Sequence, residues 1–286
     1  MIKVNELSKK YNAENVIDDL SFTLESGTIY GLIGSNGSGK TTLIKCLTGI
    51  YRPDKGEVTL DNNLIYENRN AKREIAYIED TPQHINHFTV TRMGLYYGSF
   101  YDDFSHERFL ELADELSLNP KAHISNMSLG QKKKLSFALA FARNAKHIIL
   151  DEPENGLDNE SRLVVRKLIQ DAADNGASVL ISSHDLTNIE DMCDTIFMID
   201  KGKIIYTDSI DDILENASKW LIKATDASDL DAYVLQQEDD VMTVVLLRDR
   251  VSAREYLLSK NTTIIDSLKV ELIDTYMALK EVGNNE

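Results

Sequence analysis

Cysteine is scarce in this sequence, which contains two among its 286 residues. Cys46 and Cys193 lie far apart, and neither belongs to a Cys-x-x-Cys motif or to a cluster of cysteine and histidine. This usage argues against a small domain held by disulfide bonds, and it gives no indication of a zinc site. It suits a protein of a reducing compartment.

Long apolar runs are missing as well. The longest, such as TVVLL (243–247) and HIIL (147–150), are far shorter than the roughly 18 residues that span a bilayer. The N-terminal stretch MIKVNELSKKY has no long apolar region of the kind found in a signal peptide. We therefore expect a cytosolic protein.

Basic residues are outnumbered, because 31 Lys and Arg stand against 47 Asp and Glu, for a formal net charge of −16. This balance argues against nucleic-acid binding and against loose adhesion to anionic lipid, both of which rely on Lys and Arg. A role at a membrane would require docking on a specific partner protein. The length and the 42% hydrophobic content indicate one large domain, or a domain with an accessory one.

One stretch of this acidic chain has no acidic residue: GLIGSNGSGKTTL, residues 31–43. It contains the pattern G-x-x-x-x-G-K-[ST] between an expected strand at 28–33 and an expected helix from Lys40 to Gly49. Glycines let backbone N–H groups form a nest for phosphate oxygens, and the helix adds its positive N-terminal end. Lys40 can reach the β- and γ-phosphates, and the Thr41 hydroxyl can ligate Mg²⁺. The alternative is a glycine-rich turn with an incidental lysine, but the strand and helix around it favour phosphate binding. The predicted nucleotide-binding residues are Gly34, Ser35, Asn36, Gly37, Ser38, Gly39, Lys40, Thr41 and Thr42.

A second motif is HIILDEP, residues 147–153, a short apolar run that is typical of a buried parallel strand. Asp151 ends the strand, where its carboxylate can hold Mg²⁺ through water beside the phosphate nest. Glu152 follows and can polarise the attacking water as general base. An ordinary acidic exit from a strand is the alternative, which the pairing with the nest makes less favourable.

The third motif is NMSLGQKKKLSFALAFARN, residues 126–144. Ser128 is placed to cap the N-terminus of a helix whose apolar face includes Leu135, Ala138 and Leu139, and an exposed helix start attracts an anion. The lysines at 132–134 are interpreted as a solvated face of this helix. The sequence pattern alone does not tie this helix start to the nucleotide of the first motif.

At this point the chain resembles the nucleotide-binding subunit of an ATP-binding-cassette (ABC) transporter, over about residues 1–210. SLGQ is similar to the family signature SGGQ and lies ahead of HIILDEP, in the family's order. The resemblance implies that Tyr11 stacks on adenine, that the Gly156–Asp158 loop communicates between two sites, and that His184 is the switch residue near the γ-phosphate. Taken alone, Tyr11 is also compatible with a packed surface aromatic and His184 with a structural histidine. The residues it assigns to the facing nucleotide are Ser128, Leu129, Gly130, Gln131 and Asp158.

The sequence departs from the family pattern at two places. Leu129 replaces the usual glycine of the signature, which implies looser backbone approach to phosphate and weaker catalysis at worst. The glutamine that contacts Mg²⁺ should follow IAYI, where this chain has Glu79 and Asp80, and the next glutamine is Gln83. We align Asp80 with that role, as a carboxylate that can hold Mg²⁺ through water, and Glu79 and Gln83 stay as alternatives.

The expected fold is α/β: a P-loop NTPase core of the ABC type with an antiparallel β subdomain and a helical subdomain, followed by a small α+β appendage. We expect the ATPase domain at 1–216, with its helical subdomain at about 85–143, and the accessory domain at 217–286. The aromatic group LYYGSFYDDF, residues 95–104, is interpreted mainly as core of the helical subdomain, with lining of a partner groove as the alternative.

The resemblance implies an ATP hydrolase that uses ATP and Mg²⁺ and works as a head-to-tail dimer, with itself or with a second ATPase subunit. We expect it to power export, of peptide or antibiotic, through a separate transmembrane permease at the cytoplasmic face of the membrane. An importer subunit, a soluble ABC protein acting on ribosomes or DNA, and a non-hydrolysing regulator are the alternatives. A single cassette without heptads argues against the soluble class, and Glu152 with His184 argues against the regulator.

Overall fold

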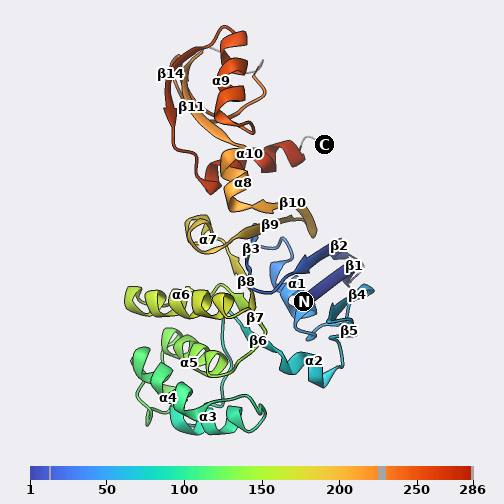
Figure 1. Ribbon diagram of the computed structural model, residues 1–286, viewed down its shortest axis with the longest axis vertical. Helices are drawn as coiled ribbons and strands as arrows, with labels where there is room; N and C mark the ends of the chain where they lie inside the picture. The colour runs from blue at the N-terminus through green and yellow to red at the C-terminus, as the bar shows by residue number, and fades with distance from the viewer. Residues whose placement is uncertain (13, 225–229, 285–286) are drawn as a thin grey trace. The chain divides into compact units, whose positions relative to one another are not determined.

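A six-stranded sheet lies at the centre of the first part of the chain (Figure 1). The computed structural model describes residues 1–12, 14–224 and 230–284. The strand order is β10-β9-β3-β8-β7-β6, and β3, β8, β7 and β6 pair in parallel. The strands are β3 Ile29–Ile33, β6 Ile75–Ile78, β7 His147–Asp151, β8 Ser178–Ser183, β9 Thr195–Asp200 and β10 Lys203–Ser209. Every residue of β3, β7 and β8 is buried, which explains their apolar sequences.

Helices and a second sheet accompany this central sheet. The second sheet is antiparallel, in the order β2-β1-β4-β5, with β1 Ile2–Tyr11, β2 Glu14–Leu24, β4 Lys55–Leu60 and β5 Asn63–Leu64. Helices α3, α4 and α5 pack against one another as the helical subdomain (Figure 1). The helices are α1 Lys40–Leu47, α2 Arg69–Arg73, α3 Val90–Gly98, α4 His106–Glu115, a 3₁₀ turn at Ile124–Asn126, α5 Leu129–Phe141 and α6 Asn159–Asp174. The predicted fold class is confirmed.

The chain forms two compact units, Met1–His184 with Met198–Ile204, and Asp185–Phe197 with Ile205–Glu286. The second unit contains an antiparallel sheet in the order β12-β13-β11-β14. Its elements are α7 Leu186–Met192, α8 Ile210–Glu215, β11 Ser218–Lys223, β12 Tyr233–Glu238, β13 Val241–Leu246, α9 Arg250–Ser259, β14 Thr263–Leu268 and α10 Leu272–Asn284. The predicted domain boundary between 216 and 217 stays a prediction.

The second unit has a core of its own, because one face of its sheet and the helix α9 bury apolar side chains together. The core residues are Trp220, Ile222, Met242, Val244, Leu246, Ala253 and Leu257. Helix α10 packs on α7 and α8, where the Leu272 N–H donates to the Glu190 carboxylate at 2.7 Å. Ser209 caps α8 by accepting the Asp212 N–H at 3.0 Å.

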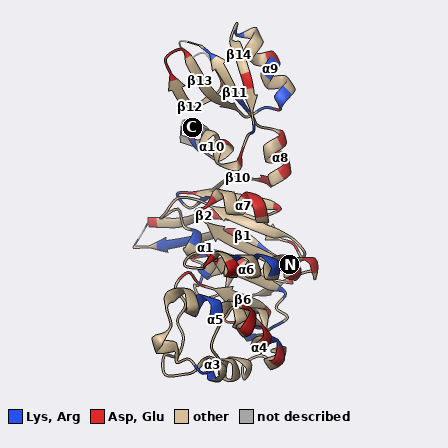
Figure 2. Cartoon of the chain, turned by 90° about the vertical axis from the view of Figure 1, so that its left-hand side faces the viewer, with Lys and Arg blue, Asp and Glu red and all other residues tan. Residues whose placement is uncertain are grey.

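The surface carries the excess of acidic residues on both units, for example along α4 and α8 (Figure 2). The aromatic group at 95–104 is more exposed than we expected. Leu95, Tyr96 and Phe100 have exposed fractions of 57%, 42% and 44%, so the interpretation of this group mainly as core is wrong for these three. Tyr97 and Phe104 contact each other and remain partly buried.

Candidate nucleotide-binding and hydrolysis site

The glycine-rich loop connects β3 to α1, at the edge where the parallel strands end. A Cβ atom at Gly34 would lie 2.4 Å from the Ile199 carbonyl oxygen and 2.5 Å from Ser38 Oγ, so only glycine fits there. Gly39, at the N-cap of α1, has φ of 111°, and its Cβ would meet the Val16 carbonyl at 2.7 Å. In the described structure no side chain caps α1, so its first N–H groups are available to an anion.

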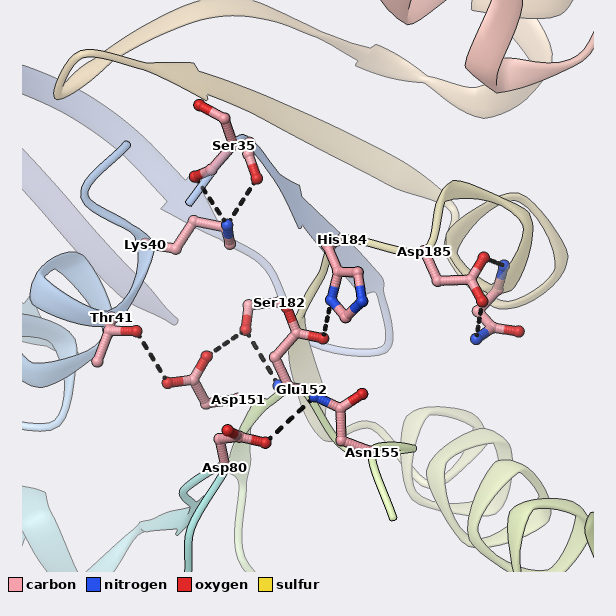
Figure 3. A network of polar contacts seen from close by, with 12 residues as sticks. Ser35, Lys40, Thr41, Asp80, Asp151, Glu152, Asn155, Ser182, His184 and Asp185 are labelled. Atoms are coloured by element: carbon pink, nitrogen blue, oxygen red, sulfur yellow. Dashed lines mark hydrogen bonds and ion pairs between the residues drawn. The ribbon is translucent and has the colours of Figure 1, made fainter. Parts of the chain in front are cut away.

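Lys40 begins α1 and folds back over this loop. Its exposed fraction is 8%, and Nζ donates to the carbonyl oxygens of Gly34 at 2.6 Å and Ser35 at 3.2 Å (Figure 3). Burial lowers the pKa of Lys40, while the carboxylates of Glu152 and Asp151 act in the opposite direction. A triphosphate in the cleft would add negative charge beside this ammonium group and favour its charged form.

Asp151 is fixed by hydroxyl groups on two sides (Figure 3). Thr41 Oγ1 donates to Asp151 Oδ2 at 3.2 Å, and Ser182 Oγ donates to Asp151 Oδ1 at 2.5 Å. Asp151 and Ser182 are direct neighbours in the parallel pairing of β7 and β8. The sequence reasoning missed Ser182, and the pairing of these two strands is the signal that would have found it.

Glu152 follows Asp151 in a left-handed backbone conformation, with φ of 50°. Its N–H donates to the Ser182 carbonyl at 3.1 Å and lies 3.2 Å from Ser182 Oγ. Its carboxylate Oε2 is 2.8 Å from Nδ1 of His184, the residue that follows β8 (Figure 3). The structure therefore brings the predicted general base and the predicted switch histidine into hydrogen-bond contact.

A cleft of about 300 Å³ is lined by residues of both the glycine-rich loop and the HIILDEP segment. Its lining residues are Val16, Ser35, Asn36, Gly37, Gly39, Lys40, Thr41, Thr42, Asp80, Asp151 and Glu152. The oxygen atoms of Thr41, Asp151 and Asp80 form a hard donor set of the type that Mg²⁺ accepts together with water and phosphate. The described residues show no cluster of three or more His, Cys, Asp or Glu side chains that could hold a metal alone. These donors therefore fit a cation that arrives with a phosphate ligand.

Asp80, rather than Glu79 or Gln83, lines this cleft. Glu79 instead accepts the N–H of Gln83 at 3.1 Å. Asp80 Oδ1 accepts from Lys133 Nζ at 3.1 Å and from Asn155 Nδ2 at 3.3 Å. The prediction of a solvated lysine face at 132–134 is therefore wrong for Lys133, whose exposed fraction is 0%, because the helix turns this side chain toward Asp80.

Comparison with known proteins agrees with these motifs. The family model for ABC transporters matches residues 17–155. The "SkfA peptide export ATP-binding protein SkfE" of Bacillus subtilis is 32% identical over 213 residues, which cover 72% of this chain and 87% of that protein. The chain belongs to the ATP-binding proteins of ABC transporters. It is thus an ATP hydrolase and the ATPase subunit of a transporter.

Two further comparisons extend over the cassette or over the whole chain. The "ABC transporter ATP-binding protein YtrB" of Bacillus subtilis is 28% identical over 288 residues and covers 97% of both chains, including the second unit. A solved dimer of "the ATP-binding cassette MJ0796 bound to ADP and Pi" has a TM-score of 0.67 at 20% identity. It covers 73% of this chain and 99% of that one, and it shows the common fold.

The signature segment of this ABC subunit lies at the start of α5. Ser128 and Gln131 form a capping box, in which each side chain accepts the other's backbone N–H, as the predicted N-cap requires. A Cβ at Gly130 would lie 2.3 Å from the Gly156 carbonyl oxygen, which places the signature against the Gly156–Asp158 loop. Leu129, at the position of the family glycine, has an exposed fraction of 51%. Of the described residues, Ser128–Gln131 are not among those that line the cleft.

Asp158 and Tyr11 lie outside the lining of the cleft, among the described residues, as does His184. Asp158 caps α6 by accepting the Ser161 N–H at 2.9 Å, and a 2.6 Å contact with Lys134 holds the pKa of its carboxyl far below the usual range. Tyr11 has an exposed fraction of 43%, and its ring meets that of Tyr51 edge-on at 6.1 Å between centroids. Burial, and then hydrogen bonding to Tyr51, raise the pKa of Tyr11.

No helix among the described residues is long and apolar enough to cross a bilayer.

Proposed function

We propose that this ABC ATPase subunit powers export, of a peptide or peptide antibiotic, through a separate transmembrane permease. The proposal on direction and cargo is supported by the similarity to SkfE, which is named a peptide export protein. It implies that the chain works at the cytoplasmic face of the membrane, bound to the permease. The observation that carries the proposed mechanism is the convergence of Lys40, Asp151 and Glu152 on one cleft.

The residues of the cleft have distinct roles in this proposal. Backbone N–H groups of Gly34–Thr42 and the Lys40 ammonium bind the β- and γ-phosphates. Thr41, Asp151 and Asp80 would hold Mg²⁺, which would neutralise phosphate charge. Glu152 accepts a proton from the water that attacks the γ-phosphorus, while the bond from that phosphorus to the bridging oxygen breaks and ADP leaves. His184 orients the Glu152 carboxylate through its 2.8 Å contact.

A facing subunit completes the site in this proposal. The segment Ser128–Gln131 forms the start of α5, and its Leu129 is exposed. Among the described residues, this segment does not line the cleft of its own chain. A head-to-tail dimer, of two copies or of this chain with a related one, would bring this helix start to the γ-phosphate of the opposite cleft. Tyr11 would stack on adenine, and the Gly156–Asp158 loop would connect the two sites.

The first experiment replaces Glu152 by Gln in the full chain and measures ATP turnover with Mg²⁺. Turnover should fall by about 10²–10⁴-fold, the usual contribution of a general base, while ATP binding and the ATP-dependent dimer persist. Glu57→Gln, an exposed change on β4, is the control and should turn over at the normal rate. Undiminished turnover of Glu152→Gln would contradict the assignment of the base.

The second experiment tests the partner. Purification of the tagged chain from a mild detergent extract should recover a polytopic membrane protein, and Glu152→Gln with ATP should improve recovery by keeping the dimer closed. Recovery of ribosomes instead would favour a non-transport function. A co-purifying solute-binding protein would contradict the direction of transport.

A further inference from the structure

Lys133 is a lysine that no solvent reaches. It lies in the second turn of α5, five residues after the N-cap Ser128, and its exposed fraction is 0%. Burial lowers the pKa of Lys133, and the hydrogen bond and charge of Asp80 act against that effect. A lysine that only filled space here would be replaced at little or no cost by an apolar side chain of the same size, because burying a charge is expensive. The contacts of its ammonium group therefore need an explanation.

One contact is made with the loop after β6. Lys133 Nζ donates to Asp80 Oδ1 at 3.1 Å, and the same oxygen accepts from Asn155 Nδ2 at 3.3 Å (Figure 3 for Asp80 and Asn155). The Asp80 side chain is 49% exposed and lines the nucleotide cleft. Lys133 therefore holds, from the buried side, a carboxylate that also lines the cleft.

The second contact is made with Glu152. Lys133 Nζ donates to the Glu152 carbonyl oxygen at 2.5 Å, while the Glu152 N–H is bound by Ser182. Both peptide groups around the Glu152 Cα are therefore fixed, and between them φ is 50°. A left-handed conformation costs a residue with a side chain about 1–2 kcal/mol, so it persists where surrounding contacts enforce it. The direction of the Glu152 carboxylate depends on that conformation.

We propose that Lys133 is a positioning residue for ATP hydrolysis. Its ammonium group links the carbonyl oxygen of Glu152 to the carboxylate of Asp80, so that a shift of the Asp80 loop changes the orientation of the Glu152 carboxylate. This rests on the proposed role of Glu152 as general base. The device connects the start of the signature helix, the Asp80 loop and the base through one side chain. A small displacement suffices, because misplacing a reacting group by about 1 Å can cost about 10²-fold in rate.

The test measures kcat, KM and ATP affinity of the full chain with Lys133→Met, an apolar side chain of similar length. At saturating Mg²⁺ we expect kcat to fall by about 10- to 100-fold, while KM and the dissociation constant for ATP stay within about threefold, because Lys133 does not line the cleft among the described residues. Lys132→Met, the same change one residue earlier on the less buried side of α5, should keep the normal kcat. Equal losses in binding and turnover would overturn the proposal.

A double-mutant cycle separates positioning from general damage. Lys133→Gln and Asp80→Asn should each lower kcat at saturating Mg²⁺, and the double variant should be no worse than about threefold below the poorer single one, because the broken contact is shared. Effects that multiply would show that the two residues act independently and would overturn the proposal. Lys133→Arg, which keeps the cation, should exceed Lys133→Met in kcat, and the absence of any such rescue would also count against it.

Two readouts keep the outcomes apart. Circular dichroism and the melting temperature show whether each variant folds, and failure of every Lys133 variant to fold would assign Lys133 to folding and overturn the proposal. Glu152→Gln is measured in parallel. If that variant is inactive while Lys133→Met keeps the normal kcat, this inference fails and the proposed function stands. If Glu152→Gln itself is active, the proposed function fails.

Discussion

Ser182→Ala is the sharpest test of how the cleft holds Asp151, the carboxylate that we propose as a Mg²⁺ ligand. The hydroxyl donates to Asp151 Oδ1 at 2.5 Å, and both residues are at least 95% buried. Removing it leaves Asp151 with the Thr41 hydroxyl at 3.2 Å, and it leaves the Glu152 N–H with the Ser182 carbonyl at 3.1 Å. The change therefore deletes one charge-assisted hydrogen bond and the 3.2 Å contact between the Glu152 N–H and the same hydroxyl oxygen, and it leaves no donor without a partner.

The expected loss follows from that contact. A hydrogen bond to a charged group contributes about 1.5–3 kcal/mol to the free energy of unfolding. The cavity left by one oxygen atom is small and adds little to this loss. A loss near 2 kcal/mol lowers the melting temperature of a domain of this size by about 4–8 °C. Asp151 would then be oriented by the Thr41 hydroxyl alone. If it is a Mg²⁺ ligand, the Mg²⁺ concentration for half-maximal ATP hydrolysis should rise by about 10- to 100-fold, the usual effect of removing a hydrogen-bond partner of a metal ligand.

The assay combines thermal unfolding followed by circular dichroism with Mg²⁺ titrations of ATP turnover. Ser99→Ala is the control, because Ser99 Oγ donates at 2.6 Å to the Tyr96 carbonyl at an exposed helix end, where substitutions stay within about 0.5 kcal/mol. The reasoning would be refuted by a Ser182→Ala protein that melts like Ser99→Ala and needs no more Mg²⁺ than the unmodified chain.

Two further predictions concern the glycine loop and acid stability. Gly34→Ala should abolish ATP binding, because the new Cβ would lie 2.4 Å from the Ile199 carbonyl oxygen. Gly37→Ala should cost only about 1 kcal/mol of backbone strain, because its φ is 82° and no atom lies within 4 Å of the new Cβ. Equal ATP affinities of the two variants in a filter-binding assay would contradict this prediction. Burial, and then the nearby N-terminal amino group, lower the pKa of His147 from about 6.5 to about 4. As the pH drops through that interval, His147 is protonated in the unfolded chain before it is protonated in the folded one. The free energy of unfolding therefore falls, by about 3 kcal/mol in total. His147→Gln should remove this part of the pH dependence in urea unfolding measured from pH 4 to 7, and an unchanged slope would show that other groups cause it.

The parts of the fold that depend on local pattern could be predicted from the sequence. The loop from β3 to α1 needs glycine where backbone approaches backbone, so its pattern identifies both the turn and its use. The capping box of Ser128 and Gln131 is likewise set by residues three apart. The convergence of Asp151 with Lys40 on one cleft was expected because buried parallel strands end at one edge.

The contacts that escaped prediction depend on which strands and helices become neighbours. In the sequence, Ser182 is a small polar residue near the end of an apolar strand. Its role as a hydrogen-bond donor to Asp151 follows from the pairing of their two strands. The lysines at 132–134 look like three equivalent surface cations, since composition predicts exposure for each. Helical geometry then separates them, because successive residues differ by about 100° in direction. Lys133 alone of the three has an exposed fraction of 0%, and it contacts Asp80, the carboxylate that we align with the glutamine of the family. The ammonium group of Lys133 and the carboxylate of Asp80 offset each other's charge. The burial of Lys133 therefore depends on a partner 53 residues away in the sequence, which the local pattern at 132–134 does not reveal.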